Sequence, residues 1–228
     1  GFQLKLLAAV LMVLDHVQYY LPGYPLWFRY LGRLSAPIFF FMAVEGFIHT
    51  RNRRRLMSRM LAGALVMAAG SRALLAVMPY YSDLPNIFLS LATGILILWS
   101  IRWGEDTGRP ALGNALAALW MLVSLSTEYS AYGVAMVLCF YHFRGNKRGL
   151  AIAHSLISIL PSLRSFAMGA HAWLTWDYQW MMVFALPLLL LYNGRRGNDT
   201  AIAKWFFYVF YPAHLWVLYA MGYAAFNR

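Results

Sequence analysis

Long apolar runs recur along this chain and constrain its fold more than any other feature. The first extends from Leu4 to Leu21, close to the roughly 20 residues that a helix needs to cross a hydrocarbon core. Of the 228 residues, 61% are hydrophobic and 12% are charged, whereas a soluble domain carries about 25% charge. Because helices satisfy their own backbone hydrogen bonds in lipid, the sequence predicts an all-α, polytopic transmembrane helix bundle. We expect one domain over residues 1–228.

The positions of the runs and of the basic residues together predict a topology. The runs indicate nine helices, over residues 4–21, 29–50, 58–79, 85–103, 110–127, 131–143, 149–166, 177–193 and 203–225. Of the 19 Lys and Arg residues, 14 fall at alternate helix ends: Lys5, Arg51, Arg53, Arg54, Arg55, Arg59, Arg102, Arg109, Arg144, Lys147, Arg148, Arg195, Arg196 and Lys204. This asymmetry predicts a cytoplasmic N-terminus and accounts for the net charge of +11. We therefore expect membrane lipids, and no nucleic acid, as partners.

Two adjacent polar residues, Asp15 and His16, lie inside the first apolar run. A charged group at membrane depth is costly and usually faces a protein interior or a functional site. At ~1.5 Å per residue, Arg33 near the start of the second predicted helix lies at a similar depth. We expect Arg33 to lie within ion-pair reach of Asp15, because either charge alone in the membrane is unfavourable.

The last predicted helix carries a polar stripe that leads to a second histidine at this depth. Lys204, Tyr208, Tyr211 and His214 follow one another at spacings of four, three and three residues. Such spacings place side chains along one helix face. We therefore expect His214 to lie at the depth of His16.

A second polar group occupies the other end of the second predicted helix. Glu45 and His49 form an i,i+4 pair. The arginine cluster that follows consists of Arg51, Arg53, Arg54 and Arg55. Clustered arginines suit a phosphorylated ligand and equally suit lipid headgroups.

Polar residues in the loops on the opposite side are candidates for binding a substrate: Asn86, Glu128 and Tyr132. The single cysteine, Cys139, has no partner for a thiolate metal site. We expect no metal in this protein.

Several blocks resemble the TraX family of integral membrane acetyltransferases, named for F-pilin acetylation. The blocks are LKLLAAVLMVLDH at Leu4–His16, YLGRLSAPIFFFMAVEGFIHT at Tyr30–Thr50, Asn86–Phe88, Tyr132–Gly133 and KWFFYVFYPAHL at Lys204–Leu215. They cover most of the chain in the family's order. Gln18 departs from the small residue that often follows the Asp-His pair.

The resemblance implies an enzyme of the bacterial inner membrane that takes an acetyl group from cytoplasmic acetyl-CoA. The acceptor would be an amine or hydroxyl of an exported protein, peptide or glycan, such as a pilin N-terminus. We expect the catalytic residues among His16, Asp15, Arg33, Glu45, His49 and His214. We expect the acyl donor at Arg51, Arg53, Arg54 and Arg55, with Lys204, Tyr208 and Tyr211 as further candidates.

Three questions stay open at the level of sequence. His16 serves either as a general base or as a nucleophile that carries the acetyl group. Asp15 either orients His16 or pairs with Arg33, since adjacent residues on a helix point about 100° apart. The function itself also has alternatives to an acetyltransferase. A proton-coupled transporter would use the same intramembrane residues, and a lipid-binding assembly factor is a further alternative.

Overall fold

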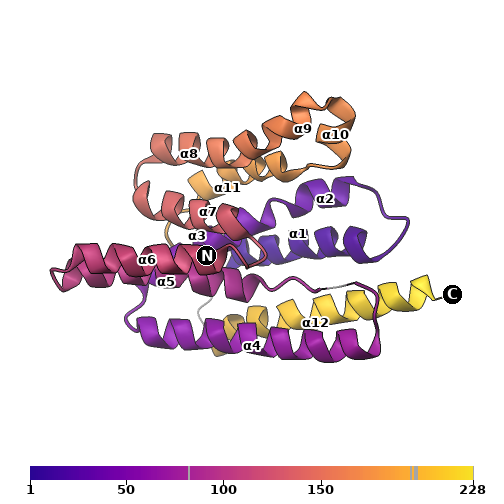
Figure 1. The fold of residues 1–228 in the computed structure, drawn as a ribbon, viewed down its shortest axis with the longest axis horizontal. Coiled ribbons are helices and arrows are strands. Elements are labelled where there is room, and N and C mark those ends of the chain that lie inside the picture. Colours follow the sequence, from indigo (N-terminus) through magenta and orange to yellow (C-terminus); the bar gives the residue numbers. More distant parts are fainter. Residues whose placement is uncertain (82, 196, 198–199, 228) are drawn as a thin grey trace. The chain divides into compact units, whose positions relative to one another are not determined.

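The structure, a computed structural model, describes residues 1–81, 83–195, 197 and 200–227, apart from the side chains of residues 201, 202 and 204. Every regular element in this part of the chain is a helix (Figure 1). The α-helices are α1 (Phe2–Tyr20), α2 (Trp27–Gly32), α3 (Ser35–His49), α4 (Arg53–Val77), α5 (Ile87–Asp106), α6 (Pro110–Ser124), α7 (Ser130–His142), α8 (Lys147–Ile159), α9 (Leu163–Ala167), α10 (Ala170–Thr175), α11 (Leu186–Leu190) and α12 (Ala201–Phe226). Two 3₁₀ helices, η1 (Leu160–Ser162) and η2 (Gln179–Ala185), complete the set. The all-α prediction is confirmed.

Four segments of the described chain are long and apolar enough to cross a membrane: Trp27–His49, Arg53–Val77, Ile87–Asp106 and Lys147–Ala167. Shorter apolar helices cover Pro110–Ser124, Ser130–His142 and Gln179–Leu190. These lengths and compositions support a membrane protein. The count of nine helices and the cytoplasmic N-terminus stay predictions.

The chain divides into two compact units whose residues alternate along the sequence. Unit 1 comprises Gly1–Phe39, Ala73–Ser82 and Lys147–Arg228, and unit 2 comprises Phe40–Arg72 and Asp83–Asn146. In unit 1, α1 packs against α2 and α12, and α8 packs against η2 and α11. In unit 2, α5 packs against α6 and α7.

Two glycines allow the close pairing of α5 and α6 in unit 2. A Cβ at Gly113 would lie 2.7 Å from the Cα of Gly104. Because neither position carries a side chain, the backbones of α5 and α6 run side by side (Figure 1). Small residues at such contacts are typical of helix pairs in membranes, where close packing is a main source of association.

Three predicted helices are interrupted in the structure. The helix predicted over 29–50 divides into α2 and α3. The helix predicted over 149–166 passes through η1, which contains Pro161, and the one predicted over 177–193 is η2 followed by α11, which contains Pro187. A proline lacks the N–H that would bond to the carbonyl four residues earlier, so the α-helical ladder is broken at both prolines.

Candidate functional site

The Asp15 and His16 side chains are buried within unit 1, on helix α1. Asp15 is 5% exposed and His16 is 7% exposed. A buried carboxylate is stable only when it is paired or hydrogen-bonded. The surroundings of these two side chains therefore decide what they can do.

Asp15 is paired with two arginines of unit 1. Arg33 Nη2 donates a hydrogen bond to Asp15 Oδ2, and Arg29 Nη1 lies 3.3 Å from the same oxygen. The predicted Asp15–Arg33 ion pair is confirmed. In the described part of the chain Asp15 forms no hydrogen bond with His16, so it serves the arginines rather than orienting the histidine.

The sequence analysis did not select Arg29, the first residue of the helix predicted over 29–50. Arg29 is 8% exposed and lies on α2. It precedes Arg33 by four residues, so the two side chains share one helix face. That spacing was the signal that could have identified it.

Gly32 allows α2 to approach α1 at Asp15. A Cβ at this position would lie 2.3 Å from Asp15 Cβ and 2.6 Å from Asp15 Oδ1. Real side chains do not fit at such distances. The Gly32-Arg33 pair therefore combines a close backbone approach with a guanidinium placed on the carboxylate.

A tyrosine from a distant segment covers the arginine pair. Arg29 Nη2 donates a hydrogen bond of 2.8 Å to the hydroxyl of Tyr178. The guanidinium carbons of Arg29 and Arg33 lie 4.8 Å and 5.4 Å from the centre of the Tyr178 ring, and Arg29 also lies 5.0 Å from the Tyr19 ring. These contacts are cation–π interactions, and no local sequence signal predicted Tyr178.

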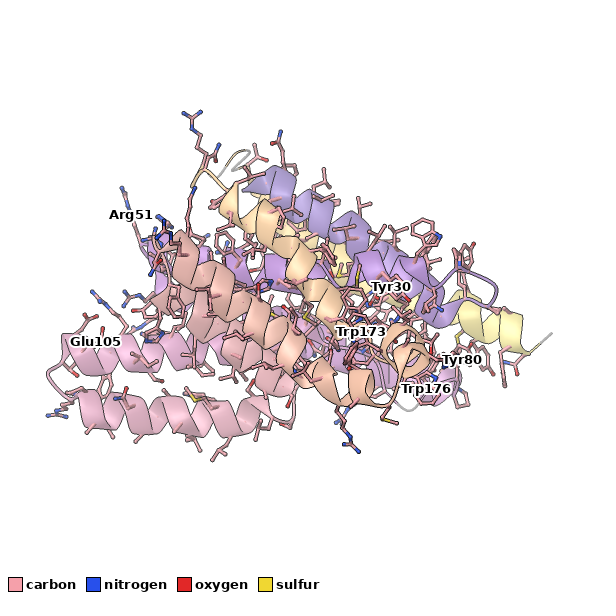
Figure 2. The ribbon with its side chains drawn as sticks, turned by 90° about the horizontal axis from the view of Figure 1, so that it is seen from above. Tyr30, Arg51, Tyr80, Glu105, Trp173 and Trp176 are labelled. Atoms are coloured by element: carbon pink, nitrogen blue, oxygen red, sulfur yellow. The ribbon has the colours of Figure 1, made fainter. Side chains whose placement is uncertain are left out.

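The segment that carries Tyr178 is itself held in place. The Asp177 carboxylate accepts hydrogen bonds from the hydroxyls of Ser162 and Ser165 and from the backbone N–H of Gln179. On the preceding turn, the hydroxyl of Tyr30 donates to the carbonyl of Leu174 at 2.5 Å. This contact ties α2 to α10, and the labelled residues Tyr30 and Trp173 of these two helices appear near each other in Figure 2.

His16 meets His214, as the predicted shared depth suggested. His16 Nδ1 and His214 Nε2 are 2.9 Å apart, and the ring centres are 5.1 Å apart. His214 Nδ1 lies 2.9 Å from the backbone carbonyl of Phe210. Of the predicted stripe on α12, Tyr211 also touches His214, with ring centres 5.7 Å apart.

The other members of the stripe are less informative. Tyr208 is half-buried on α12. The side chain of Lys204 lies outside the part of the chain that the structure describes. A role for either residue in binding the acyl donor stays a prediction.

The predicted Glu45–His49 pair forms in unit 2 and gains a partner that the sequence did not indicate. Arg144 Nε donates to Glu45 Oε1 at 3.0 Å, and Arg144 Nη2 lies 3.1 Å from His49 Nε2. His49 Nδ1 lies 2.9 Å from the Glu45 backbone carbonyl. Both ring nitrogens of His49 are therefore engaged. This arrangement suits a structural ion-pair cluster that holds helices together better than it suits a general base.

The arginine cluster follows directly at the start of α4, in unit 2. Arg51, Arg54 and Arg55 are exposed, and Figure 2 shows Arg51 extending outward. Arg53 is half-buried, lies 3.7 Å from the carboxylate of Asp106 and covers the Phe47 ring at 5.1 Å. Three of the four guanidinium groups therefore remain open to an anionic ligand in solution or at a headgroup layer.

The predicted substrate residues all belong to unit 2. Asn86 caps α5, because its side-chain oxygen accepts from Leu89 N, and its amide donates to the Ala64 carbonyl at 3.0 Å. Glu128 is exposed and Tyr132 is half-buried. The structure thus gives Asn86 a structural role, and substrate contact by these three residues stays a prediction.

Comparisons with known proteins agree with the resemblance. A family described as "TraX protein" matches residues 1–222. The chain is 26% identical to the "Probable fimbrial assembly protein FimC, serogroup H1" of Dichelobacter nodosus, over 96% of this chain and 93% of that protein. It is 27% identical to "Protein TraX" of Escherichia coli, over 94% of this chain and 84% of that protein. No solved structure matches it. Since the family match spans nearly the whole chain, this protein belongs to the TraX family.

Proposed function

We propose that this protein is an integral membrane acetyltransferase that moves an acetyl group from acetyl-CoA to an amine or hydroxyl of an exported acceptor. The observation that carries the proposal is the buried imidazole of His16. One of its nitrogens lies against His214, and the other forms no hydrogen bond within the part of the chain that the structure describes. Beside it in the sequence lies a carboxylate already neutralised by arginines. Buried, specifically paired titratable groups of this kind are typical of functional sites.

The reaction requires little from the protein beyond a base and a positive environment. His16 takes the proton from the acceptor nitrogen or oxygen while that atom forms a bond to the acetyl carbonyl carbon. The carbon–sulfur bond then breaks, and His16 returns the proton to the departing thiolate. If His16 is instead the nucleophile, its ring nitrogen carries the acetyl group between two such steps.

Arg29 and Arg33 supply the positive environment. Two guanidinium groups face the one carboxylate of Asp15, so this cluster carries a surplus positive charge. Negative charge develops on the acetyl carbonyl oxygen during attack, and fixed positive groups in a site shielded from water stabilise it. The stack on Tyr178 keeps both guanidinium groups in place.

The acyl donor would bind at the arginine cluster of unit 2. The open arginines, Arg51, Arg54 and Arg55, suit the phosphates of CoA. The positive-inside asymmetry supports a cytoplasmic location for this cluster and for the N-terminus. This is the side on which CoA is made, so donor entry from the cytoplasm follows.

The acceptor is proposed from the names of the relatives. One is described as a fimbrial assembly protein and the other as TraX. A role in pilus-related processes is therefore the starting point, with the N-terminal amine of an exported pilin subunit as the first acceptor to test. A glycan hydroxyl is the second.

The test uses the purified full chain in lipid nanodiscs with acetyl-CoA. Release of the CoA thiol and acetylation of an added peptide amine are measured for the wild type, His16→Asn and the control His154→Gln. His154 is also a buried histidine of unit 1, and its Nε2 lies 3.0 Å from the backbone carbonyl of Met182, a hydrogen bond that the amide of glutamine can imitate. We expect activity in the wild type and the control, and its loss in His16→Asn. If the folded wild type releases no thiol, and if vesicles that contain it take up a solute in exchange for or together with protons, the alternative function of a proton-coupled transporter would be favoured.

A further inference from the structure

The hydrogen bonds around His214 determine which of its nitrogens carries the proton. A backbone carbonyl can only accept a hydrogen bond. Since His214 Nδ1 lies 2.9 Å from the Phe210 carbonyl, Nδ1 must be the donor. In the neutral ring the other nitrogen, Nε2, then has a lone pair and can only accept.

The acceptor on His214 in turn determines which nitrogen of His16 carries the proton. Its Nδ1 lies 2.9 Å from His214 Nε2, which is an acceptor, so His16 Nδ1 carries the proton. The lone pair of neutral His16 is therefore on Nε2. In the described part of the chain, Nε2 of His16 forms no hydrogen bond.

The usual orienting group for a catalytic histidine is a carboxylate. Asp15 is adjacent in sequence, but its carboxylate is held by Arg33 and Arg29. The orienting function therefore falls to a second imidazole, His214, and beyond it to a carbonyl of the α12 backbone.

We propose that His214, anchored by the Phe210 carbonyl, holds His16 in the Nδ1-protonated tautomer, so that Nε2 is the nitrogen that reacts. His214 is a positioning residue in this scheme, and the inference rests on the proposed acetyltransferase function. When His16 Nε2 takes a proton from the acceptor, the His16 Nδ1–H bond to His214 becomes charge-assisted and stronger. His214 thus also stabilises the imidazolium that forms.

The pair suits a neutral resting state. The guanidinium groups of Arg33 and Arg29 act on His16 with a repulsive charge, and a second cationic ring at His214 would add to it. A neutral donor–acceptor pair avoids this repulsion. It also keeps the Nε2 lone pair available before substrate binds.

The tautomer is measured directly by nitrogen-15 NMR of the histidine-labelled full chain in nanodiscs, without acetyl-CoA. The protein supplies its own reference, because His154 Nε2 donates to the Met182 carbonyl at 3.0 Å and must therefore be the protonated nitrogen there. The His16 signal is identified by its loss in His16→Asn. We expect His16 to be protonated at Nδ1 and His154 at Nε2.

Two variants at position 214 then separate the orienting role from simple packing. In His214→Ala the acceptor is gone, so His16 should lose its preference for the Nδ1-protonated form. In His214→Gln the side-chain carbonyl can accept from His16 Nδ1–H and should restore that preference. His154→Gln is the matched control and should leave the His16 tautomer unchanged.

The rate of acetyl transfer should follow the tautomer. Loss of the correct histidine tautomer in a Ser-His-Asp triad lowers kcat about 10⁴-fold, and we expect His214→Ala to lower it at least roughly 10²-fold. His214→Gln should recover most of that loss. A wild-type His16 protonated at Nε2, a tautomer unchanged in His214→Ala, or full activity in that variant would each overturn the inference. Because the NMR needs no turnover, a wild type without transfer activity would refute the proposed function separately.

Discussion

The two units each contain a buried carboxylate, an arginine and a histidine, but the histidines differ in what is left available. In unit 1, the carboxylate of Asp15 pairs with the two arginines, and one nitrogen of His16 has no hydrogen-bond partner among the described residues. In unit 2, Arg144 bridges Glu45 and His49, and both nitrogens of His49 are engaged.

This difference separates an open site from a closed one. A closed cluster of charges satisfies its members and fixes two helices together. An open nitrogen beside a satisfied carboxylate is suited to proton transfer. We therefore assign the chemistry to unit 1, and in unit 2 we assign Glu45, His49 and Arg144 to holding α3 against the end of α7.

Replacement of His16 in unit 1 and of His49 in unit 2 should give the largest difference in the rate of acetyl transfer. His16→Ala removes the general base, which is typically worth about 10²–10⁴ in rate, and should abolish measurable transfer in a protein that still inserts. His49→Gln keeps an acceptor for Arg144 and should lower the rate less than about 10-fold on the same scale. Turnover numbers for the two variants in nanodiscs decide the matter, and the reverse ranking would contradict the assignment.

Replacement of Arg33 in unit 1 and of Arg144 in unit 2 compares how much each cluster contributes to the stability of the protein. Arg33→Met leaves a buried carboxylate with one partner fewer and should cost about 3 kcal/mol, the low end for a broken buried pair, because Arg29 remains. Arg144 has a side chain that is 45% exposed, so Arg144→Met should cost about 1 kcal/mol or less. Unfolding in detergent monitored by circular dichroism measures both. Equal losses would show that the deeper burial of the unit 1 pair does not make it the larger contributor to stability.

Two glycine substitutions test the close contact between α1 and α2. Gly32→Ala places a Cβ against Asp15, and overpacking of this kind typically costs about 1–3 kcal/mol. Gly46→Ala in unit 2 meets nothing within 4 Å and should be neutral or slightly stabilising. The thermal midpoint should fall in Gly32→Ala and should stay the same or rise slightly in Gly46→Ala. A Gly32→Ala protein as stable as the wild type would rule out the tight approach.

Neutralising the open arginines of unit 2 should have the smallest effect. The triple variant Arg51→Gln, Arg54→Gln, Arg55→Gln should raise the KM for acetyl-CoA about 5-fold, since exposed charge contacts are worth a few tenths of a kcal/mol each. The effect should be larger at low salt, where screening is weaker. Arg102→Gln, which breaks ion pairs with Glu105 and Asp106, is the control. A flat KM with impaired insertion would reduce the cluster to a topological anchor.

The sequence predicted those parts of the site that follow from regular helix geometry. The rise of a helix placed Arg33 and His214 at the depth of Asp15 and His16, and both contacts form. It also predicted the i,i+4 contact between Glu45 and His49.

Contacts between distant segments could not be predicted in this way. Tyr178 reaches Arg29 across 149 residues, and Arg144 reaches Glu45 across 99. Hydropathy is averaged over many residues and does not register a single proline. The segments that contain Pro161 and Pro187 were therefore predicted as continuous helices. The two units could not be predicted either, because their segments alternate along the chain and no change of composition marks the boundary between them.

Acetyl transfer that depends on His16 can be measured in sealed proteoliposomes with acetyl-CoA labelled in its acetyl group. The labelled donor is supplied on the side of the arginine cluster, and a peptide with a free N-terminal amine is placed on the other side. Mass spectrometry then follows label in the peptide. We expect labelled peptide with the wild type and with His154→Gln, and none with His16→Ala. Equal labelling with folded His16→Ala protein, or no labelling with the wild type on either side, would contradict it.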